Sequence, residues 1–333
     1  MVCIKKTMKL AVVILNWNGR EMLKKYLPSV LMGSGYSVIV ADNGSTDGSV
    51  EMLRSEFPEV GVIELDRNYG FAEGYNRALS EVDAEYYLLL NSDVEIRDKG
   101  WTEPLLHYMD LHKDCAACAP KLHSLLQPDM FEYAGAAGGY VDVLGFPYCR
   151  GRVMNHVEKD MGQYDSIVPL LWASGAALMV RAEDYWFAGG LDDRFFAHME
   201  EIDLCWRLRT LGKQIVCIPE STVYHLGGAT LSQGNPRKTF LNFRNNMLML
   251  YKNLPRGWKM PVVVGVRVVL NTVAGLAYYI KGDKGNGNAV FKAQREFFRL
   301  VPDFKKDRAQ NLDRRVVRRV PEVKGLTIVA AFR

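Results

Sequence analysis

The chain has 333 residues, of which 48% are hydrophobic and 24% charged, an ordinary composition for a soluble globular protein with one large or two ordinary domains. Its formal charge is uneven: Lys and Arg less Asp and Glu gives −11 for residues 1–235 and +15 for residues 236–333. The basic C-terminal part predicts an anionic partner. Nucleic acid is excluded as that partner, because the rest of the chain is acidic and carries no nucleic-acid-binding motif.

Four apolar runs in the first hundred residues predict buried parallel strands. They lie at residues 10–15, 37–41, 60–65 and 86–90, and segments with helical apolar spacing separate them. The first run is only six residues long, so it is a strand and not the apolar core of a secretory signal peptide. Strict alternation of strand and helix requires a parallel sheet with helices on both faces.

Polar side chains follow these strands where each one ends. Asn16, Asp42 and Asp93 close three of the four runs, and ligands of open α/β sheets bind outside the carboxyl ends of the strands. A lone carboxylate at Asp93 suits an oxygen-seeking divalent cation, which in turn suits a diphosphate. Asn and Asp also favour turns and helix N-caps, so that alternative stays open for each residue. No G-x-G-x-x-G follows the first strand, which argues against a nicotinamide or flavin site.

The middle of the chain contains a glycine-rich segment and a strand of small residues. Residues 134–140 are too glycine-rich for a regular element and are either a binding loop or a plain surface loop. Residues 170–181 return to a strand. Its centre carries small residues, which let a ligand or another chain approach the backbone closely.

A second polar cluster opens a predicted helix that Gly212 ends. Glu200, Glu201 and Asp203 fall in its first turn. Acidic residues there interact well with the helix dipole, and a carboxylate in that position could also act as a general base. After a further strand at residues 214–219, His225 precedes a Gly-Gly turn. From residue type alone, His225 is either structural or a metal ligand.

The basic C-terminal part contains a long apolar segment. Residues 260–280 are nearly long enough to span a bilayer. Arg267 and Asn271 share one face of the predicted helix, so a packed or interfacial amphipathic helix is favoured over a span. Flanking basic residues and a cluster at Arg314, Arg315, Arg318 and Arg319 fit an anionic membrane surface. The alternative is a packed helix with a solvated basic face.

Several motifs in one order resemble family 2 glycosyltransferases of the GT-A fold, within roughly residues 8–232. They lie at residues 13–19, 40–47, 68–72, 90–93 and 200–207, with the Tyr224-His225 turn after them. Within the family, the chain is most similar to rhamnosyltransferase-like enzymes of bacterial cell-surface polysaccharides.

The resemblance implies an α/β fold with a mixed, mainly parallel sheet flanked by helices. Residues 8–100 would form the Rossmann-like nucleotide-binding half of a domain at residues 1–235, and residues 101–235 its acceptor and catalytic half. Residues 236–333 would be a basic, helical C-terminal extension.

The resemblance also assigns roles to individual residues. Asp93 and His225 would hold Mn²⁺ or Mg²⁺, with Asn91 in place of the first carboxylate of the family's Asp-x-Asp motif. Glu201 would be the catalytic base, where Asp is more usual, and Asp203 a nearby catalytic acid. The residues expected at the nucleotide are Asn16, Asn18, Asp42, Asn68, Gly70 and Asn91. Those expected at the donor or acceptor sugar are Trp172, Ser174, Gly175 and Glu200.

The function that follows is inverting, metal-dependent transfer of a sugar to a hydroxyl of a lipid-linked cell-surface glycan. We expect a UDP- or dTDP-sugar donor, and an enzyme in the cytoplasm, peripheral on the inner face of the cytoplasmic membrane. One alternative is a sugar nucleotidyltransferase, which would usually carry a Gly-rich, basic triphosphate loop that residues 16–20 lack. Another is a non-catalytic glycan-binding or assembly subunit, against which the retained Asp93, Glu201 and His225 argue.

Overall fold

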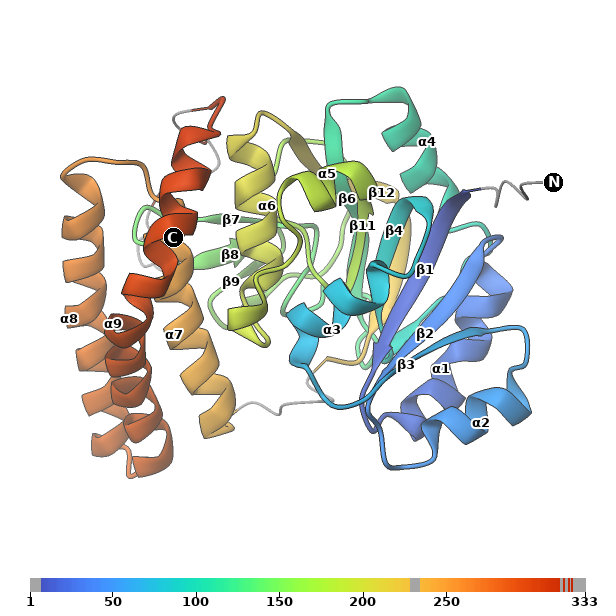
Figure 1. Ribbon diagram of the computed structural model, residues 1–333, viewed down its shortest axis with the longest axis horizontal. Coiled ribbons are helices and arrows are strands. Elements are labelled where there is room, and N and C mark those ends of the chain that lie inside the picture. Colours follow the sequence, from blue (N-terminus) through green and yellow to red (C-terminus); the bar gives the residue numbers. More distant parts are fainter. Residues whose placement is uncertain (1–6, 228–233, 318–319, 321–322, 324, 326–333) are drawn as a thin grey trace.

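A computed structural model of the chain describes residues 7–227, 234–317, 320, 323 and 325. An eight-stranded mixed sheet runs through it in the order β3-β2-β1-β4-β11-β6-β12-β5 (Figure 1). The predicted parallel half is confirmed. It comprises β1 (Met8–Asn16), β2 (Ser37–Asn43), β3 (Gly61–Leu65) and β4 (Ala84–Asn91). The second half contains β5 (Val94–Glu95), β6 (Cys115–Ser124), β11 (Ala177–Arg181) and β12 (Gln214–His225).

Alternation along the apolar strands builds one core on each face of the sheet, because successive side chains of a strand point to opposite faces. In β1, Leu10, Val12 and Ile14 pack into one core, whereas Ala11 and Val13 belong to the other. The first core is covered by α1 (Arg20–Gly33), α2 (Ser49–Glu56) and α4 (Glu103–Leu111). The second core is covered by α3 (Gly70–Leu79), α5 (Ala182–Phe187) and α6 (Glu200–Thr210).

The glycine-rich region folds into a small antiparallel sheet, which the sequence did not predict. Its strands are β7 (Gly139–Val141), β8 (Pro147–Cys149), β9 (Arg152–Val153) and β10 (His156–Val157). The strand predicted at residues 170–181 is shorter, because only its second half pairs in the main sheet as β11. The strand predicted at residues 214–219 is longer: β12 continues to His225, where it pairs with β6 and β5.

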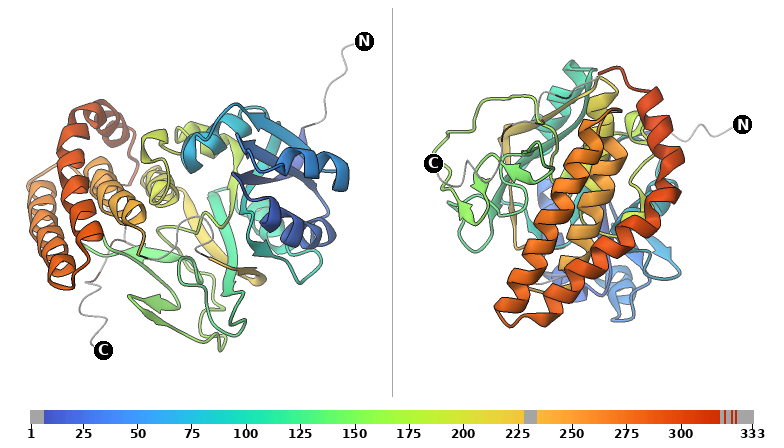
Figure 2. Two further views of the ribbon diagram at one scale, coloured as in Figure 1. Left: turned by 90° about the horizontal axis from the view of Figure 1, so that it is seen from below. Right: turned by 90° about the vertical axis from the view of Figure 1, so that its left-hand side faces the viewer.

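Three helices after the sheet form a layer of their own, α7 (Pro236–Asn253), α8 (Lys259–Ile280) and α9 (Lys284–Asp313). Figure 1 shows this layer at the end of the molecule opposite α1 and α2, and Figure 2 shows it face on. Asn235 caps α7 by accepting a hydrogen bond from the backbone N–H of Arg237 at 2.8 Å. The predicted helical C-terminal extension is thus confirmed, and α8 corresponds to the helix predicted at residues 260–280. The last helix, α9, encloses Pro302.

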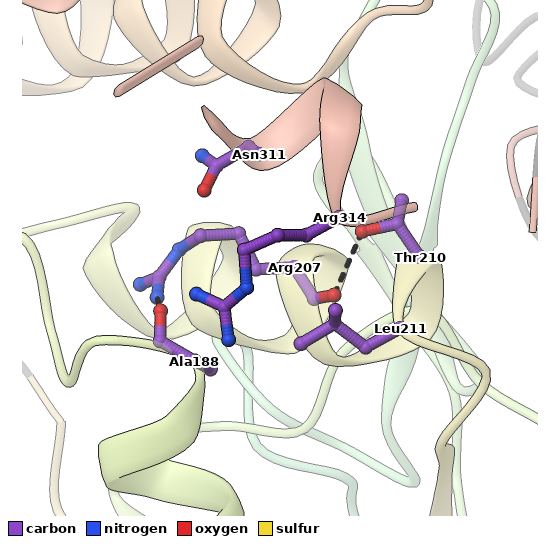
Figure 3. A pocket seen from close by; sticks show the side chains of 6 residues that line it. All are labelled: Ala188, Arg207, Thr210, Leu211, Asn311 and Arg314. Atoms are coloured by element: carbon purple, nitrogen blue, oxygen red, sulfur yellow. Dashed lines mark hydrogen bonds between the residues drawn. The ribbon is translucent and has the colours of Figure 1, made fainter. Parts of the chain in front are cut away.

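The end of α9 packs against α6 and α5 (Figure 3). Arg314 Nη2 donates to the carbonyl of Phe187 at 2.5 Å, and Arg315 donates to the carbonyl of Asn253. These two members of the predicted basic cluster therefore bind the protein itself, while Arg318 and Arg319 lie outside the described residues. The pocket at this junction contains none of the predicted site residues and is lined by Ala188, Arg207, Thr210, Leu211, Asn311 and Arg314.

Candidate active site

Asn16 and Asp42 meet at the carboxyl edge of the sheet, because β1 and β2 pair in parallel with these two residues in register. Asn16 Nδ2 donates to Asp42 Oδ2 at 2.9 Å, and the other oxygen, Asp42 Oδ1, accepts from the backbone N–H of Ser45 at 2.8 Å. Both side chains are almost fully buried, and Asn16 Oδ1 has no partner. The pair thus leaves one buried acceptor at the edge where a nucleotide was predicted.

The loops after β1 and β2 are joined by further hydrogen bonds. Asn18, with φ of 50°, accepts from the backbone N–H of Thr46 at 2.8 Å through Oδ1 and donates its own N–H to Ser45 Oγ at 2.8 Å. Asp47 accepts from the backbone N–H of Arg20 at 2.9 Å. Asn18 therefore shapes the predicted nucleotide pocket by fixing the two loops to each other.

Asn68 and Gly70 form the turn into α3. Asn68 Oδ1 accepts a hydrogen bond from the backbone N–H of Gly70, two residues further along, at 2.8 Å. Asn43, which the sequence analysis did not single out, donates to the carbonyl of Gly70 at 2.9 Å and accepts from the N–H of Tyr69 at 3.0 Å. Gly70 has φ of 80°, and a Cβ there would lie 2.7 Å from the carbonyl oxygen of Phe196. A side chain is excluded at this position by conformation and by space.

Asp93 and His225 come together across the sheet, although 132 residues separate them in sequence. His225 Nε2 lies 3.1 Å from Asp93 Oδ1 and 3.3 Å from Asn91 Nδ2. Burial opposes ionisation of both groups, but their mutual attraction prevails. It lowers the pKa of Asp93, and with Glu132 it raises the pKa of His225 to about 10.

This donor set fits a divalent cation that a substrate helps to bind and that would displace the proton of His225 Nε2. Two adjacent ligands of such an ion, each at about 2.0–2.2 Å, lie about 3 Å apart, as Asp93 Oδ1 and His225 Nε2 do. No third His, Cys, Asp or Glu joins them closely enough to form a three-residue metal cluster within residues 7–227 and the described part beyond. Phosphate oxygens and water usually complete such a site. Glu132, whose Oε1 lies 3.6 Å from His225 Nδ1, is a neighbour that the sequence did not reveal.

Glu201, the second residue of α6, lies close to the small residues that precede β11. A Cβ on Gly175 would lie 3.6 Å from the Cβ of Glu201 and 3.4 Å from the ring of Phe71. The next residue, Ala176, accepts from the backbone N–H of Asn91 at 3.0 Å. Glu201 Oε2 has no hydrogen-bond partner, and burial raises the pKa of the Glu201 carboxyl. The arrangement therefore leaves one carboxylate oxygen of Glu201 without a competing partner.

Glu200 and Ser174 lie beside this group but are enclosed. Glu200 is buried with Oε2 unpartnered, and burial, followed by the charge of Glu201, raises the pKa of Glu200 well above its ordinary value. Of these two neighbouring carboxyls, Glu200 is therefore the harder to ionise. Ser174 Oγ accepts from the backbone N–H of Ala176 at 3.3 Å and so shapes the turn before β11.

The loop before Glu201 has an unusual backbone. Phe196, His198 and Met199 all have positive φ, at 66°, 71° and 76°. Such conformations persist where surrounding contacts hold them. The N–H groups of Phe71 and Ala72 in α3 donate to the carbonyl of Phe196 at 2.6 and 3.2 Å. From the other side, Asn245 of α7 donates through Nδ2 to the carbonyls of Phe195, Ala197 and His198 at 2.8–2.9 Å.

Two predicted site residues point elsewhere. Asp203 is fully buried. It accepts hydrogen bonds from Arg207 and Lys252 at 2.8 Å and from Asn253 at 2.7 Å. The predicted catalytic role is therefore replaced by a structural one, which attaches α7 to α6. Trp172 is also buried and donates to the carbonyl of Tyr140 at 3.0 Å, so it supports β7 and has no free polar atom for a sugar.

Comparison with known proteins places these features in context. The family described as Glycosyl transferase family 2 matches residues 11–130. The N-acetylglucosaminyl-diphospho-decaprenol L-rhamnosyltransferase of Mycobacterium tuberculosis is 25% identical over 273 residues, 76% of this chain and 87% of that protein. The hexosyltransferase Agl10 of low-salt glycan biosynthesis in Haloferax volcanii is 23% identical and covers 72% of this chain and 74% of its own length.

Solved structures agree on the fold. GalNAc-T7 with UDP, GalNAc and Mn²⁺ superposes with a TM-score of 0.57 at 16% identity, over 74% of this chain and 48% of that one. The mannosyltransferase PcManGT from Pyrobaculum calidifontis, with GDP-Man and Mn²⁺, gives 0.53 at 12% identity and covers 88% of both chains. The predicted GT-A fold is thus confirmed. The chain is a glycosyltransferase whose residues 11–130 match family 2 and which resembles rhamnosyltransferases.

Proposed function

We propose that this enzyme transfers a sugar from a nucleotide-diphosphate donor to a hydroxyl of a lipid-linked glycan, with inversion at the anomeric carbon. The observation that carries the proposal is the juxtaposition of three groups at one sheet edge. They are the Asn16–Asp42 pair, the Asp93–His225 pair and the partly exposed Glu201, whose Oε2 has no hydrogen-bond partner. Each supplies one requirement of the reaction: a nucleotide site, a diphosphate site and a base.

The proposed chemistry is a single displacement. Glu201 takes the proton from the acceptor hydroxyl, and the oxygen of that hydroxyl forms a bond to the anomeric carbon. The bond from that carbon to the diphosphate breaks on the opposite face, which inverts the centre. A divalent cation held by Asp93 and His225 would offset the negative charge of the diphosphate. Asn16, Asn18 and Asp42 shape the pocket for base and ribose, and the Asn68–Gly70 turn borders it.

The acceptor is proposed to be lipid-linked, as the name of the mycobacterial relative says of that protein. We further propose that the enzyme works in the cytoplasm, peripheral on the inner face of the cytoplasmic membrane. Its one helix with the length and composition of a span, among the described residues, is α8.

A screen of donors tests the proposal. The full chain is heated with UDP-, dTDP- and GDP-sugars in the presence of Mn²⁺ or Mg²⁺, because ligands of the native state raise its midpoint of unfolding. The stabilising donor is then incubated with lipid-linked glycan acceptors. We expect release of nucleoside diphosphate coupled to a product with an inverted linkage. Pyrophosphate release from a nucleoside triphosphate would indicate a nucleotidyltransferase, and absence of any transfer would indicate a non-catalytic subunit.

Asp93→Ala should remove most of the metal-dependent nucleotide affinity. Even groups that only orient a metal ligand are typically worth about 10–100-fold in affinity, so losing a direct ligand should cost at least about 10-fold. Titration calorimetry of the nucleoside diphosphate, with and without Mn²⁺, measures this effect. Asp98→Ala, an exposed carboxylate five residues further along, is the matched control. If Mn²⁺ raised the nucleotide affinity of Asp93→Ala as much as that of the wild type, Asp93 would not be a metal ligand.

Asn245→Ala tests whether α7 holds the loop that precedes Glu201. Loss of its three hydrogen bonds to the loop should let Phe196–Met199 relax and displace Glu201. A shift of about 1 Å can lower kcat by about 10²-fold. The KM of the donor should stay unchanged, since the nucleotide residues lie on other elements. The control is Asn246→Ala, which removes one buried amide bonded to the carbonyl of Gly145 instead. Equal kcat losses in both variants would reduce the role of Asn245 to general stability.

A further inference from the structure

The polarity of α8 is reversed relative to an ordinary surface helix. Its buried residues are Arg267, Asn271 and Gly275, which are spaced four apart and face the protein. The Arg267 guanidinium lies 3.6 Å from the centre of the Phe146 ring and donates to the carbonyl of Leu144 at 3.3 Å. A Cβ on Gly275 would lie 2.9 Å from the Phe291 ring of α9. Arg267 is therefore bound within the chain, and Asn271, buried with Nδ2 unpartnered, also lies on the inner face.

The opposite face of α8 is apolar and exposed. Six residues, spaced three or four apart, form one continuous line along it, which we call the outer stripe: Val262, Val266, Val269, Val273, Leu276 and Ile280. Their exposed fractions range from 39% at Val266 to 87% at Ile280. No exposed residue between Val262 and Ile280 is charged. A contiguous apolar face of this kind marks a surface that another phase or molecule covers.

Basic and aromatic residues frame the outer stripe. Trp258, which is 72% exposed, and Lys259 lie at the start of α8, and Lys281 and Lys284 are exposed just after its end. The charged residues at the two ends of the stripe are thus mainly basic, with Asp283 the acidic one among them. Tryptophan at the edge of an apolar face and lysines around it are typical of helices at an anionic membrane surface.

We propose that the outer stripe of α8 inserts into the interface of an anionic membrane, with the helix lying along the surface. The inference rests on the proposed lipid-linked acceptor and assigns the part of the enzyme that holds it at the membrane. A membrane span is disfavoured because α8 packs along α9, where Gln294 Nε2 donates to the carbonyl of Val268 at 3.2 Å. Spanning would carry the charged side chains of α9 into hydrocarbon.

A second copy of the chain is a poorer occupant of this surface. If two outer stripes paired antiparallel, Lys259 of each helix would approach Lys281 of the other. If they paired parallel, like lysines would lie side by side. Both arrangements bring positive charges together, which is unfavourable. Asp283, the acidic residue between Lys281 and Lys284, already accepts two hydrogen bonds from Asn286. An anionic lipid surface satisfies the same lysines.

Flotation of the full chain with vesicles of equal parts phosphatidylglycerol and phosphatidylcholine tests the proposal. We expect the wild type to float with these vesicles and less so with phosphatidylcholine alone. Val269→Asp/Val273→Asp should lower the partition coefficient by at least about ten-fold. The matched control, Met32→Asp/Leu111→Asp, places the same changes on other exposed apolar residues and should float as the wild type does. Lys259→Gln/Lys281→Gln should reduce the preference for phosphatidylglycerol, which gives a second variant without a buried or apolar change.

Other readouts separate this inference from the proposed function. Donor-induced thermal stabilisation should be the same in Val269→Asp/Val273→Asp and the wild type. Flotation of that variant at wild-type levels would show that the outer stripe does not bind the membrane. Conversion of a wild-type dimer to a monomer by the same changes, seen by light scattering, would also overturn the proposal and assign the stripe to a second copy. Loss of flotation in the variant would support membrane binding by the outer stripe even if no nucleotide-sugar proves to be a donor, because flotation needs no catalysis.

Discussion

Glu201→Gln should lower kcat by about 10²–10⁴-fold, the usual contribution of a general base. The substitution keeps the length and shape of the side chain but removes the carboxylate that accepts the proton. Glu201 Oε2 has no hydrogen-bond partner, so the amide replaces no structural bond. The donor should bind to the variant as it does to the wild type, which titration calorimetry with the nucleotide-sugar would show.

Glu200→Gln provides the comparison for this prediction. Burial, with the charge of Glu201, raises the pKa of Glu200 well above its ordinary value. This favours the neutral acid, which an amide mimics closely. Its replacement should cost much less than that of Glu201. If the two variants lost activity in the opposite order, the base would be Glu200 and the assignment of Glu201 would be wrong.

The pH profile of kcat gives an independent readout. Burial raises the pKa of Glu201, and the base works only when ionised. The rate should therefore rise with pH through this raised pKa, at a higher pH than an exposed glutamate would require. The nearby thiols of Cys149 and Cys205 stay neutral there, since burial raises their pKa values to about 11 and about 12. The residual activity of Glu201→Gln should lack this rise.

The sheet edge was predictable because its determinants are local. Apolar runs of five or six residues between helices fix a parallel sheet, and the parallel register alone places Asn16 beside Asp42. His225 was harder to place. Periodicity ended the predicted strand at residue 219, whereas pairing with β6 and β5 extends β12 to His225 and carries it to Asp93. Only the tertiary partner of a strand decides such an extension.

Asp203 shows a different limit of the sequence. It lies two positions after Glu201 in the same helix, and residues two apart do not share a helix face. Helical geometry alone therefore separates the two acids, although the family motif placed both in the site. Its partners, Lys252 and Asn253, come from α7, about fifty residues further along. Neither these partners nor the loop contacts of Asn245 have a pattern in the sequence.

The orientation of α8 was undetermined for the same reason. Arg267 and Asn271 predict a polar stripe, but they do not say whether that stripe faces water or protein. The carbonyl of Leu144 and the ring of Phe146 bind the inward-facing guanidinium, and both lie between strands that the sequence did not predict. Sequence could therefore indicate an amphipathic helix, and only packing could show that its apolar side is the outer one.

Lys252→Met should destabilise the fold by about 3 kcal/mol, because removing one partner from a buried ion pair typically costs about 3–5 kcal/mol. Lys252 Nζ lies 2.6 Å from Asp192 Oδ2 and 2.8 Å from Asp203 Oδ2, with all three side chains buried. We expect the lower end of this range of energies because each carboxylate keeps an arginine as partner. Asp192 keeps Arg194, and Asp203 keeps Arg207. Urea unfolding followed by tryptophan fluorescence measures the loss.

The matched control for this change is Lys24→Met. Lys24 pairs with Glu56 at 3.0 Å on the surface, and exposed pairs are worth about 0–1 kcal/mol. The pH dependence of stability distinguishes Lys252→Met from Lys24→Met as well. Although burial opposes ionisation, Lys252 and Arg194 lower the pKa of Asp192, so its stabilisation is complete above the unfolded pKa of about 4 and disappears as pH falls.

In Lys252→Met, the pKa of Asp192 is lowered less, because Lys252 no longer contributes. The variant should therefore lose less stability between neutral and acidic pH than the wild type does. Activity should fall together with stability, since α7 also carries the Asn245 that holds the loop before Glu201. If Lys252→Met instead behaved like Lys24→Met in both its free energy of unfolding and its pH dependence, α7 would be only loosely attached. The helical layer would then be an appendage, and not the part that completes the active site.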